Sequence, residues 1–192
     1  MKTKNIIIIS IMLMTLVIPT NIALGDIIKY PDELDQECSI FDNIGLSPLN
    51  NSAVAQSFVP TMNILTRVRL LLFDNGAPQN SLKVSIRSSL SGLDLTSTIV
   101  QPGDLNDPTW ITFDFNDIQV EPLKTYYIVF KPIGAVDINN LYAWGMNNAN
   151  GYTYGSIFTS HNDYLGKKGW ISEFLNKDLC FQTYGRMQYS TT

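Results

Sequence analysis

The sequence predicts an all-β protein, an antiparallel two-sheet β-sandwich of jelly-roll type that follows an N-terminal signal peptide. Three observations lead to this fold class. Short segments alternate apolar and polar side chains along most of the chain, turn-forming Gly, Pro, Asn and Asp residues separate these segments, and no convincing amphipathic helix lies between them. Strands with one buried face are stable when two sheets pack face to face, so a sandwich is expected.

The clearest strands lie in the middle of the chain, where residues 110–115 and 125–131 alternate in this way. The break between them is expected at Asn116-Asp117 and at Glu121-Pro122, which have turn chemistry. Residues 82–88 give the most regular alternation. A jelly roll is favoured because barrels of consecutive strands usually show tighter hairpins. Further strands are expected at 38–41, 55–59, 65–73, 96–101, 141–146, 151–160 and 178–184, and one helical turn at 171–175.

Residues 1–25 have the three parts of a secretory signal peptide. Two lysines give a positive start, residues 6–18 form an apolar run, and Ala23-Leu24-Gly25 supplies small residues before a cut at Asp26. The alternative is an uncleaved anchor, but the apolar run is shorter than the roughly 20 residues that span a bilayer. We therefore expect a secreted, extracellular protein without a transmembrane anchor after cleavage.

The composition fits one domain at residues 26–186, followed by a polar tail at 187–192. Of the whole chain, 45% of the residues are hydrophobic and 16% are charged, so a real core is possible and the charged fraction is low. Without the two lysines of the leader the chain has 11 basic and 17 acidic residues, a net charge of −6. This acidic balance argues against nucleic acid as a partner.

The two cysteines, Cys38 and Cys180, allow a single pairing within the chain. Export makes a disulfide chemically permissible, and a bridge would join the first and last predicted strands. The alternative is a pair of free cysteines that act as small buried apolar residues. Metal binding by this pair is disfavoured because the chain holds one histidine and few soft ligands.

Six segments follow one another along the chain: QSFVP (56–60), LKVSIR (82–87), GLDL (92–95), WITFDF (110–115), YYIV (126–129) and FQTYG (181–185). In this order they resemble a group of jelly-roll modules from secreted and surface proteins of bacteria and archaea. Such modules are similar to galactose-binding-like and carbohydrate-binding domains, and the resemblance covers residues from about Asp35 to Gly185. It implies a sandwich that binds a ligand, and it carries no fixed set of ligand residues.

Aromatic and amide side chains are densest between residues 142 and 170. Aromatic rings stack on the apolar C–H faces of sugars, and amides hydrogen-bond sugar hydroxyls, so this segment is the candidate carbohydrate site. The alternative is that its rings are core residues or cross-strand pairs, the usual role of Tyr and Trp in a sandwich. The candidate ligand-binding residues are Trp144, Asn147, Tyr152, Tyr154, Tyr164 and Trp170.

No cofactor is expected to be required, and Ca²⁺ in a structural role is the one candidate metal. Oxygen ligands are available from Asp74-Asn75, or from Asp104 with Asn106-Asp107. The alternative is that these residues only form turns. The single histidine, His161, lies in a polar segment and is expected to be solvated rather than a ligand or a base.

The sequence does not predict an enzyme. It contains no Gly-x-Ser-x-Gly elbow and no phosphate-binding glycine loop, and no pair of facing carboxylates can be assigned. The favoured function is a non-catalytic extracellular binding module, with a glycan or surface polymer as its partner. The alternative is a structural or adhesive cell-surface protein that binds other surface proteins. A glycoside hydrolase or lyase is the least favoured reading.

Overall fold

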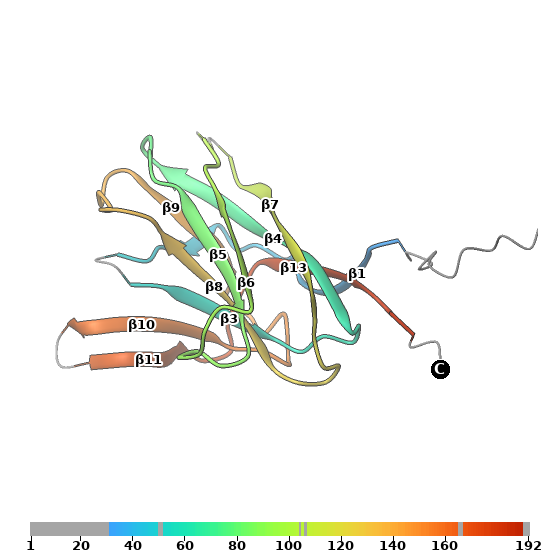
Figure 1. Cartoon of the computed structure of the whole chain (residues 1–192). Helices are drawn as coiled ribbons and strands as arrows, with labels where there is room; N and C mark the ends of the chain where they lie inside the picture. The colour runs from blue at the N-terminus through green and yellow to red at the C-terminus, as the bar shows by residue number, and fades with distance from the viewer. Residues whose placement is uncertain (1–30, 50–51, 104, 106, 165–166, 190–192) are drawn as a thin grey trace, which may run out of the picture.

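Two antiparallel β-sheets pack face to face (Figure 1), which confirms the predicted β-sandwich. The structure is a computed structural model that describes residues 31–49, 52–103, 105, 107–164 and 167–189, with the backbone alone for 161–164, 167, 168 and 173. The predicted signal peptide lies outside these ranges. In the described part of the chain every named element is a strand, and no helix there is long and apolar enough to cross a membrane.

The seven-stranded sheet is built around β4, the longest strand. β7 pairs with one edge of β4. The other edge pairs with β13 over its first part and with β9 over its last residues. β1 pairs with β13, so the first and last strands lie side by side (Figure 1). The strands are β1 (Glu33–Cys38), β2 (Ile44–Leu46), β4 (Ile64–Asn75), β7 (Thr109–Gln119), β9 (Leu141–Asn147), β12 (Asp178–Leu179) and β13 (Phe181–Arg186).

The six-stranded sheet has the order β11-β10-β3-β8-β5-β6. The chain passes from one sheet to the other at most connections, for example from β3 to β4, to β5, and later from β7 to β8 to β9. This alternation between sheets is the connectivity of a jelly roll. The strands are β3 (Val54–Phe58), β5 (Leu82–Arg87), β6 (Thr96–Val100), β8 (Tyr126–Pro132), β10 (Ile157–Tyr164) and β11 (Lys167–Phe174).

The core lies between the two sheets and contains the inward-facing side chains of both. Trp144 of β9 is at its centre and is fully buried. Its ring lies 5.7 Å from the ring of Phe130 on β8, centroid to centroid, and its Nε1 donates a hydrogen bond of 2.8 Å to the carbonyl oxygen of Cys180. The other large, fully buried side chains include Phe58, Phe113, Phe181, Leu65, Leu70 and Leu72.

Two predicted elements are wrong in the region before the last strands. Residues 151–156 do not form a strand, since β10 begins at Ile157. A side chain at Gly155 would place its Cβ 2.3 Å from the carbonyl oxygen of Ser57, so this loop is packed too closely on β3 for a regular ladder. Residues 171–174, where one helical turn was the alternative, belong to β11, because pairing with β10 fixes them as extended, and Leu175 lies in the turn that follows.

The expected break at Asn116-Asp117 is also wrong, because β7 continues to Gln119. The pairing of β7 with β4 shifts register between Leu65 and Arg67, which places a β-bulge beside these two residues. A bulge absorbs extra residues without ending a strand and redirects a side chain. Here the bulged part of β7 directs Asp117 toward Arg186 of β13.

Leu123, in the loop between β7 and β8, is a candidate for stabilisation. It has a φ of 66°, and its side chain is 80% exposed, so the strained backbone is not offset by burial. We expect Leu123→Asn to raise the free energy of unfolding by about 0.5–1 kcal/mol, because Asn tolerates the left-handed region. Urea denaturation would measure this. Leu123→Ala keeps the strain and should give no gain, and an equal gain in both variants would contradict the explanation.

Candidate functional site

The structure does not bring the six predicted ligand residues together. Trp144 belongs to the core, so its ring has no face available to a sugar, and this part of the prediction is corrected. Asn147 is also buried. Its Nδ2 donates to the carbonyl oxygen of Ile40 at 3.2 Å, and its Oδ1 accepts from the backbone N–H of Ala149 at 2.6 Å, so its amide holds a loop in place.

Tyr152 and Tyr154 lie in the same loop but differ in exposure. Tyr152 is buried, its hydroxyl accepts from the N–H of Val59 and donates to Oε1 of Gln36, both at 3.0 Å, and burial raises its pKa. Its ring packs edge-on against Phe181 at 5.1 Å, so it is a structural residue. Tyr154 is 73% exposed, the largest exposure among the members of the predicted set whose side chains are described.

Trp170 lies on the other side of the molecule, on the outer face of the six-stranded sheet. It is partly buried and packs with Tyr127 and Phe158 over the small buried residues Ala53 and Ala55. The rings of Tyr127 and Phe158 meet edge-on at 5.7 Å. The side chains of Tyr164 and His161 lie outside the described part of the structure.

A different set of aromatic and polar side chains gathers on the outer face of the seven-stranded sheet, here called the aromatic–polar face. It forms because β4 alternates: Val68, Leu70 and Leu72 point into the core, so Arg67 and Arg69 point outward. Cross-strand register then places outward side chains of β7, β13 and β1 beside them. The face consists of Glu37, Phe41, Arg67, Arg69, Phe73, Trp110, Thr112, Asp114, Gln182 and Tyr184.

One half of the aromatic–polar face is apolar. The rings of Phe41 and Phe73 lie 5.7 Å apart, centroid to centroid, above the pair formed by β2 and β9. Two glycines face each other in this pair, Gly45 and Gly145. A Cβ on Gly45 would lie 2.5 Å from Cζ of Phe73, and one on Gly145 would lie 3.1 Å from Phe41. The absence of both side chains therefore lets the two rings rest directly on the backbone.

The other half is a chain of polar contacts that runs across four strands. The guanidinium of Arg69 lies 5.7 Å from the centre of the Trp110 ring, and its Nη1 donates to Oε1 of Gln182 at 3.2 Å. The hydroxyl of Tyr184 donates to the same oxygen at 3.1 Å, and Nε2 of Gln182 donates to Glu37 at 3.3 Å. This half thus offers half-buried rings next to hydrogen-bonding groups, whereas the apolar half offers rings alone.

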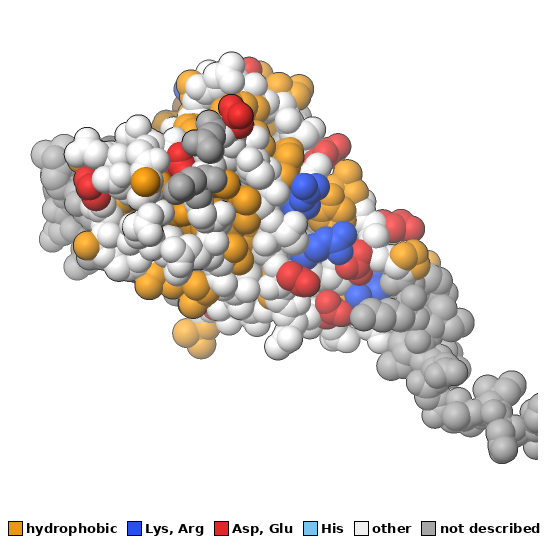
Figure 2. Space-filling view, turned by 90° about the horizontal axis from the view of Figure 1, so that it is seen from above, with side chains coloured by type: hydrophobic (Ala, Val, Ile, Leu, Met, Phe, Trp, Pro, Cys, Tyr) orange, Lys and Arg blue, Asp and Glu red, His pale blue; other side chains and the backbone are white. Residues whose placement is uncertain are grey.

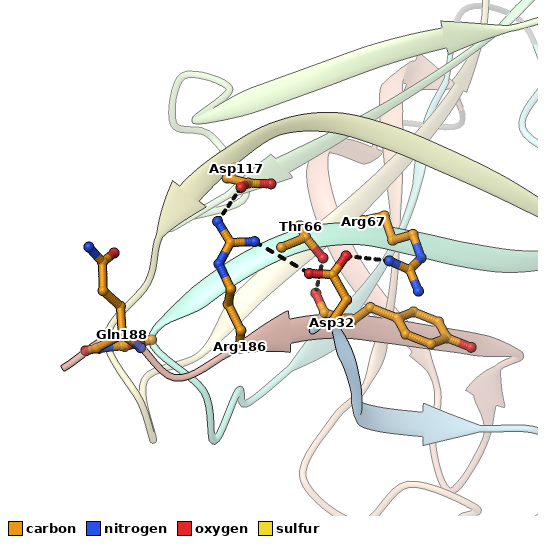
Figure 3. A network of polar contacts seen from close by, with 8 residues as sticks. Asp32, Thr66, Arg67, Asp117, Arg186 and Gln188 are labelled. Carbon is orange, nitrogen blue, oxygen red and sulfur yellow. Dashed lines mark hydrogen bonds and ion pairs between the residues drawn. The ribbon is translucent and has the colours of Figure 1, made fainter. Parts of the chain in front are cut away.

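An ion-pair network closes the aromatic–polar face near the start of β1 (Figure 3). Asp32 lies between Arg67 and Arg186 and bonds both, and Arg186 also bonds Asp117. The hydrogen bond to Asp117, together with the second one to Asp32, raises the pKa of Arg186. Arg67 in addition stacks over the ring of Tyr184, 4.1 Å from its centre. Figure 2 shows basic and acidic side chains side by side in one strip, with hydrophobic side chains next to them.

A polar hollow of about 530 Å³ lies beyond the network, at the end of the sandwich. Asn63 spans its edge: its Nδ2 donates to the carbonyl oxygen of Gln188, and its Oδ1 accepts from the N–H of Gln188, both at 2.7 Å. These two bonds fix the residues that follow β13. The hollow is lined by Asn63, Gln119, Val120, Glu121, Tyr126 and Gln188.

Metal ligands are not concentrated anywhere in the described residues, which contain no group of three or more His, Cys, Asp or Glu side chains placed to hold an ion. Asp74, one of the residues considered for Ca²⁺, accepts a hydrogen bond of 2.5 Å from the backbone N–H of Leu105 and so orders a loop. Asp104 and Asn106 lie outside the described residues. The structural Ca²⁺ stays a prediction.

Cys38 and Cys180 are both buried and are not joined by a disulfide in this structure. Cys38, the last residue of β1, is the Cα partner of Phe181, the first residue of β13, so it is a diagonal neighbour of Cys180, which directly precedes β13. Interaction with the Cys38 thiol and burial raise the pKa of the Cys180 thiol far above its ordinary value. The Sγ of Cys180 donates to the carbonyl oxygen of Ile40 at 3.2 Å.

The sequence contains a signal for the aromatic–polar face that residue density alone does not detect. In β4 and β7 every second side chain is strongly apolar and faces the core. The side chains between them, which include Arg67, Arg69 and Trp110, are therefore expected to point outward. An outward Trp or Tyr on a strand is a better candidate for binding than an aromatic residue in a dense segment.

No protein-family model and no curated protein matches this chain. The class to which the protein belongs is therefore defined by its fold and its surface. It is an antiparallel β-sandwich of jelly-roll connectivity with an aromatic–polar face on its seven-stranded sheet.

Proposed function

We propose that this protein is a secreted, non-catalytic binding module and that its aromatic–polar face binds carbohydrate. The observation that carries the proposal is the position of four half-buried rings, those of Phe41, Phe73, Trp110 and Tyr184, beside guanidinium, amide and carboxylate groups on one sheet face. Rings supply stacking surfaces for sugar C–H groups, and the polar groups donate to and accept from sugar hydroxyls.

The spacing of Trp110 and Tyr184 favours an extended ligand. They lie on strands that flank β4 and pair with Leu71 and Arg67, respectively. Two strand spacings and four residues along a strand separate their Cα atoms by roughly 16 Å. A single sugar does not span this distance, whereas an oligosaccharide does. Because the side chains come from paired strands, the geometry is fixed before the ligand binds, which reduces the entropic cost of binding.

A glycan array with the secreted chain tests the proposal, with and without added Ca²⁺. We expect a defined glycan signal, and at least a tenfold loss of affinity in Trp110→Ala and in Tyr184→Ala, because aromatic anchors dominate such interfaces. Tyr154→Ala is the matched control, since it removes an exposed ring outside the face and should leave affinity unchanged. No signal from folded protein, or a loss caused by Tyr154→Ala and not by Trp110→Ala, would overturn the assignment.

Secretion supports a further part of the proposal, a disulfide between Cys38 and Cys180. Two thiols of an exported chain would be oxidised by an oxidised dithiol carrier, which accepts two electrons and two protons as the S–S bond forms. The position of Cys180 would let this bond stabilise the contact between several strands. Its N–H donates to Gly145 of β9 and its carbonyl accepts from Leu71 of β4, so it lies where the last segment meets two other strands.

A second candidate function is supported by the outer face of the six-stranded sheet. There Tyr127, Phe158 and Trp170 form a compact apolar cluster outside the core, which suits contact with another surface protein. A blank glycan array together with a stable homo-oligomer that dissociates on Trp170→Ser would favour this adhesive function. A strict monomer would argue against it.

A further inference from the structure

We infer that the aromatic–polar face recognises glycans that carry a carboxylate, namely uronic-acid sugars, and that Arg69 is the residue that recognises the carboxylate. This inference rests on the proposed function and specifies its ligand class. It comes from a contrast among three arginines on the same side of the seven-stranded sheet, Arg67, Arg69 and Arg186.

Two of these arginines already have carboxylate partners. Arg67 is paired with Asp32, and Arg186 is paired with both Asp32 and Asp117 (Figure 3). Their positive charges are neutralised within the protein. These pairs join the segment just before β1 to β4, β7 and β13, and they compensate the charges of both guanidinium groups.

Arg69 differs because none of its contacts within the described residues is with a carboxylate. Its hydrogen bond goes to Oε1 of Gln182, a neutral acceptor, through Nη1. A guanidinium has five N–H donors arranged as a planar fork, and it is always charged. Most of these donors are therefore available to a ligand.

The surroundings of Arg69 hold the guanidinium in position without neutralising it. The cross-strand partners of Arg69 are Thr112 on β7 and Gln182 on β13, both uncharged. Oε1 of Gln182 accepts from Arg69 and from Tyr184, and so is itself held in place. A half-buried charge with few competing partners gains more from an anion than a fully exposed one does.

The position of Trp110 links the charge to a sugar. The guanidinium lies 5.7 Å from the centre of the Trp110 ring. A pyranose stacked on this ring would have a carboxylate substituent within reach of the fork, and a carboxylate accepts two parallel N–H bonds from a guanidinium. The ring and the charge together select a sugar that has both an apolar face and a carboxylate.

The acidic character of the protein restricts the anion to a modest charge density. The mature chain carries an excess of acidic residues, and Asp114 and Glu37 belong to the same face. A densely sulfated polymer would meet repulsion from these groups. A polymer with one carboxylate per sugar fits the single open guanidinium.

The test compares polymers that differ only in the carboxylate. Polygalacturonate, alginate and hyaluronan are each measured by titration calorimetry against their carboxyl-reduced, neutral counterparts, with heparin as the densely sulfated probe. We expect at least a tenfold preference for one or more of the acidic forms, and a preference that decreases with added salt. Arg69→Gln should remove the preference and leave weak binding that still depends on Trp110, and Arg69→Lys should keep part of it.

Lys83→Gln is the matched control, because it removes one positive charge on the other sheet, where Lys83 pairs with Asp94. It should leave the preference unchanged, and far-ultraviolet circular dichroism of each variant checks the fold. Equal affinity for acidic and reduced polymers, tighter binding of heparin, or a preference that survives Arg69→Gln would overturn the inference while leaving carbohydrate binding intact. Absence of binding to every polymer and on the glycan array would instead overturn the proposed function.

Discussion

Replacing Trp144 by alanine is expected to lower the free energy of unfolding by about 3–5 kcal/mol, the range for large-to-small changes of a fully buried aromatic side chain. The residue is fully buried, packs against Phe130 and donates to the carbonyl oxygen of Cys180. Alanine would leave a cavity between the two sheets and would remove one of the two hydrogen bonds to the Cys180 carbonyl, which still accepts from the N–H of Leu71. Urea denaturation followed by tryptophan fluorescence and circular dichroism measures the change, with an unchanged m-value as evidence that the native state is still compact.

Two further variants serve as comparisons for Trp144→Ala. Trp144→Phe keeps most of the volume but loses the hydrogen bond, and it should cost clearly less than alanine. Trp110→Ala removes a tryptophan that lies outside the core, and it should change stability by no more than about 1 kcal/mol while reducing glycan affinity. If Trp144→Ala were no more destabilising than Trp110→Ala, the central position of Trp144 would be contradicted and sugar stacking by Trp144 would again be open.

The second large effect is expected from the cysteine pair. A bridge between Cys38 and Cys180 would close a loop of about 140 residues, which stabilises a protein by about 5 kcal/mol in the chain-entropy model, less any strain. We expect reduction in denaturant followed by refolding in reductant to lower the midpoint of urea denaturation by a correspondingly large amount. Alkylation of the unfolded, unreduced protein, read by mass spectrometry, should label no thiol in the secreted chain.

The control for this effect is the double variant Cys38→Ser with Cys180→Ser. It should have the stability of the reduced protein and should not respond to reductant. Labelling of both thiols in the unfolded, unreduced chain would contradict the bridge and would leave the cysteines as buried apolar residues. The raised pKa of Cys180 then makes this thiol a poor nucleophile in the folded state, since the thiolate is the reactive form.

Most strands could be predicted from the sequence because their apolar side chains alternate with period two. Residues 82–88, for example, predict β5 to within one residue, since Leu82, Val84 and Ile86 are all fully buried. The same pattern predicts that β4 and β7 have one inward and one outward face. Local alternation is sufficient to predict these strands, because the burial of one face of a strand requires an apolar side chain at every second residue.

The errors occur where distant contacts override local preference. The Tyr-rich segment at 151–156 has strand propensity, but the N–H of Tyr152 bonds the buried carboxylate of Asp178, 26 residues further along the chain. This bond and the close packing of Gly155 keep the segment as a loop. Propensity carries no information about such partners.

The candidate residues from the sequence and the aromatic–polar face lie in different parts of the fold for a related reason. The candidate residues between 142 and 170 are close in sequence, whereas the aromatic–polar face joins side chains from β1, β4, β7 and β13. Alternation indicates which side chains point outward. It does not indicate which strands are neighbours, because the order of strands in a sheet depends on packing between segments far apart in the chain.

The glycine pair formed by Gly45 and Gly145 determines how a bound polymer would be held. With no glycine side chains beneath the rings, Phe41 and Phe73 pack directly on the backbone of the sheet, tilted by 52° to each other. A binding surface of this kind contacts a polymer along one side without enclosing it. Each binding event is therefore weak, and the polymer dissociates quickly. Attachment to a surface that displays many copies of the glycan would then depend on avidity. The number of protein copies that bind at once, and not the affinity of a single site, would set the strength of attachment.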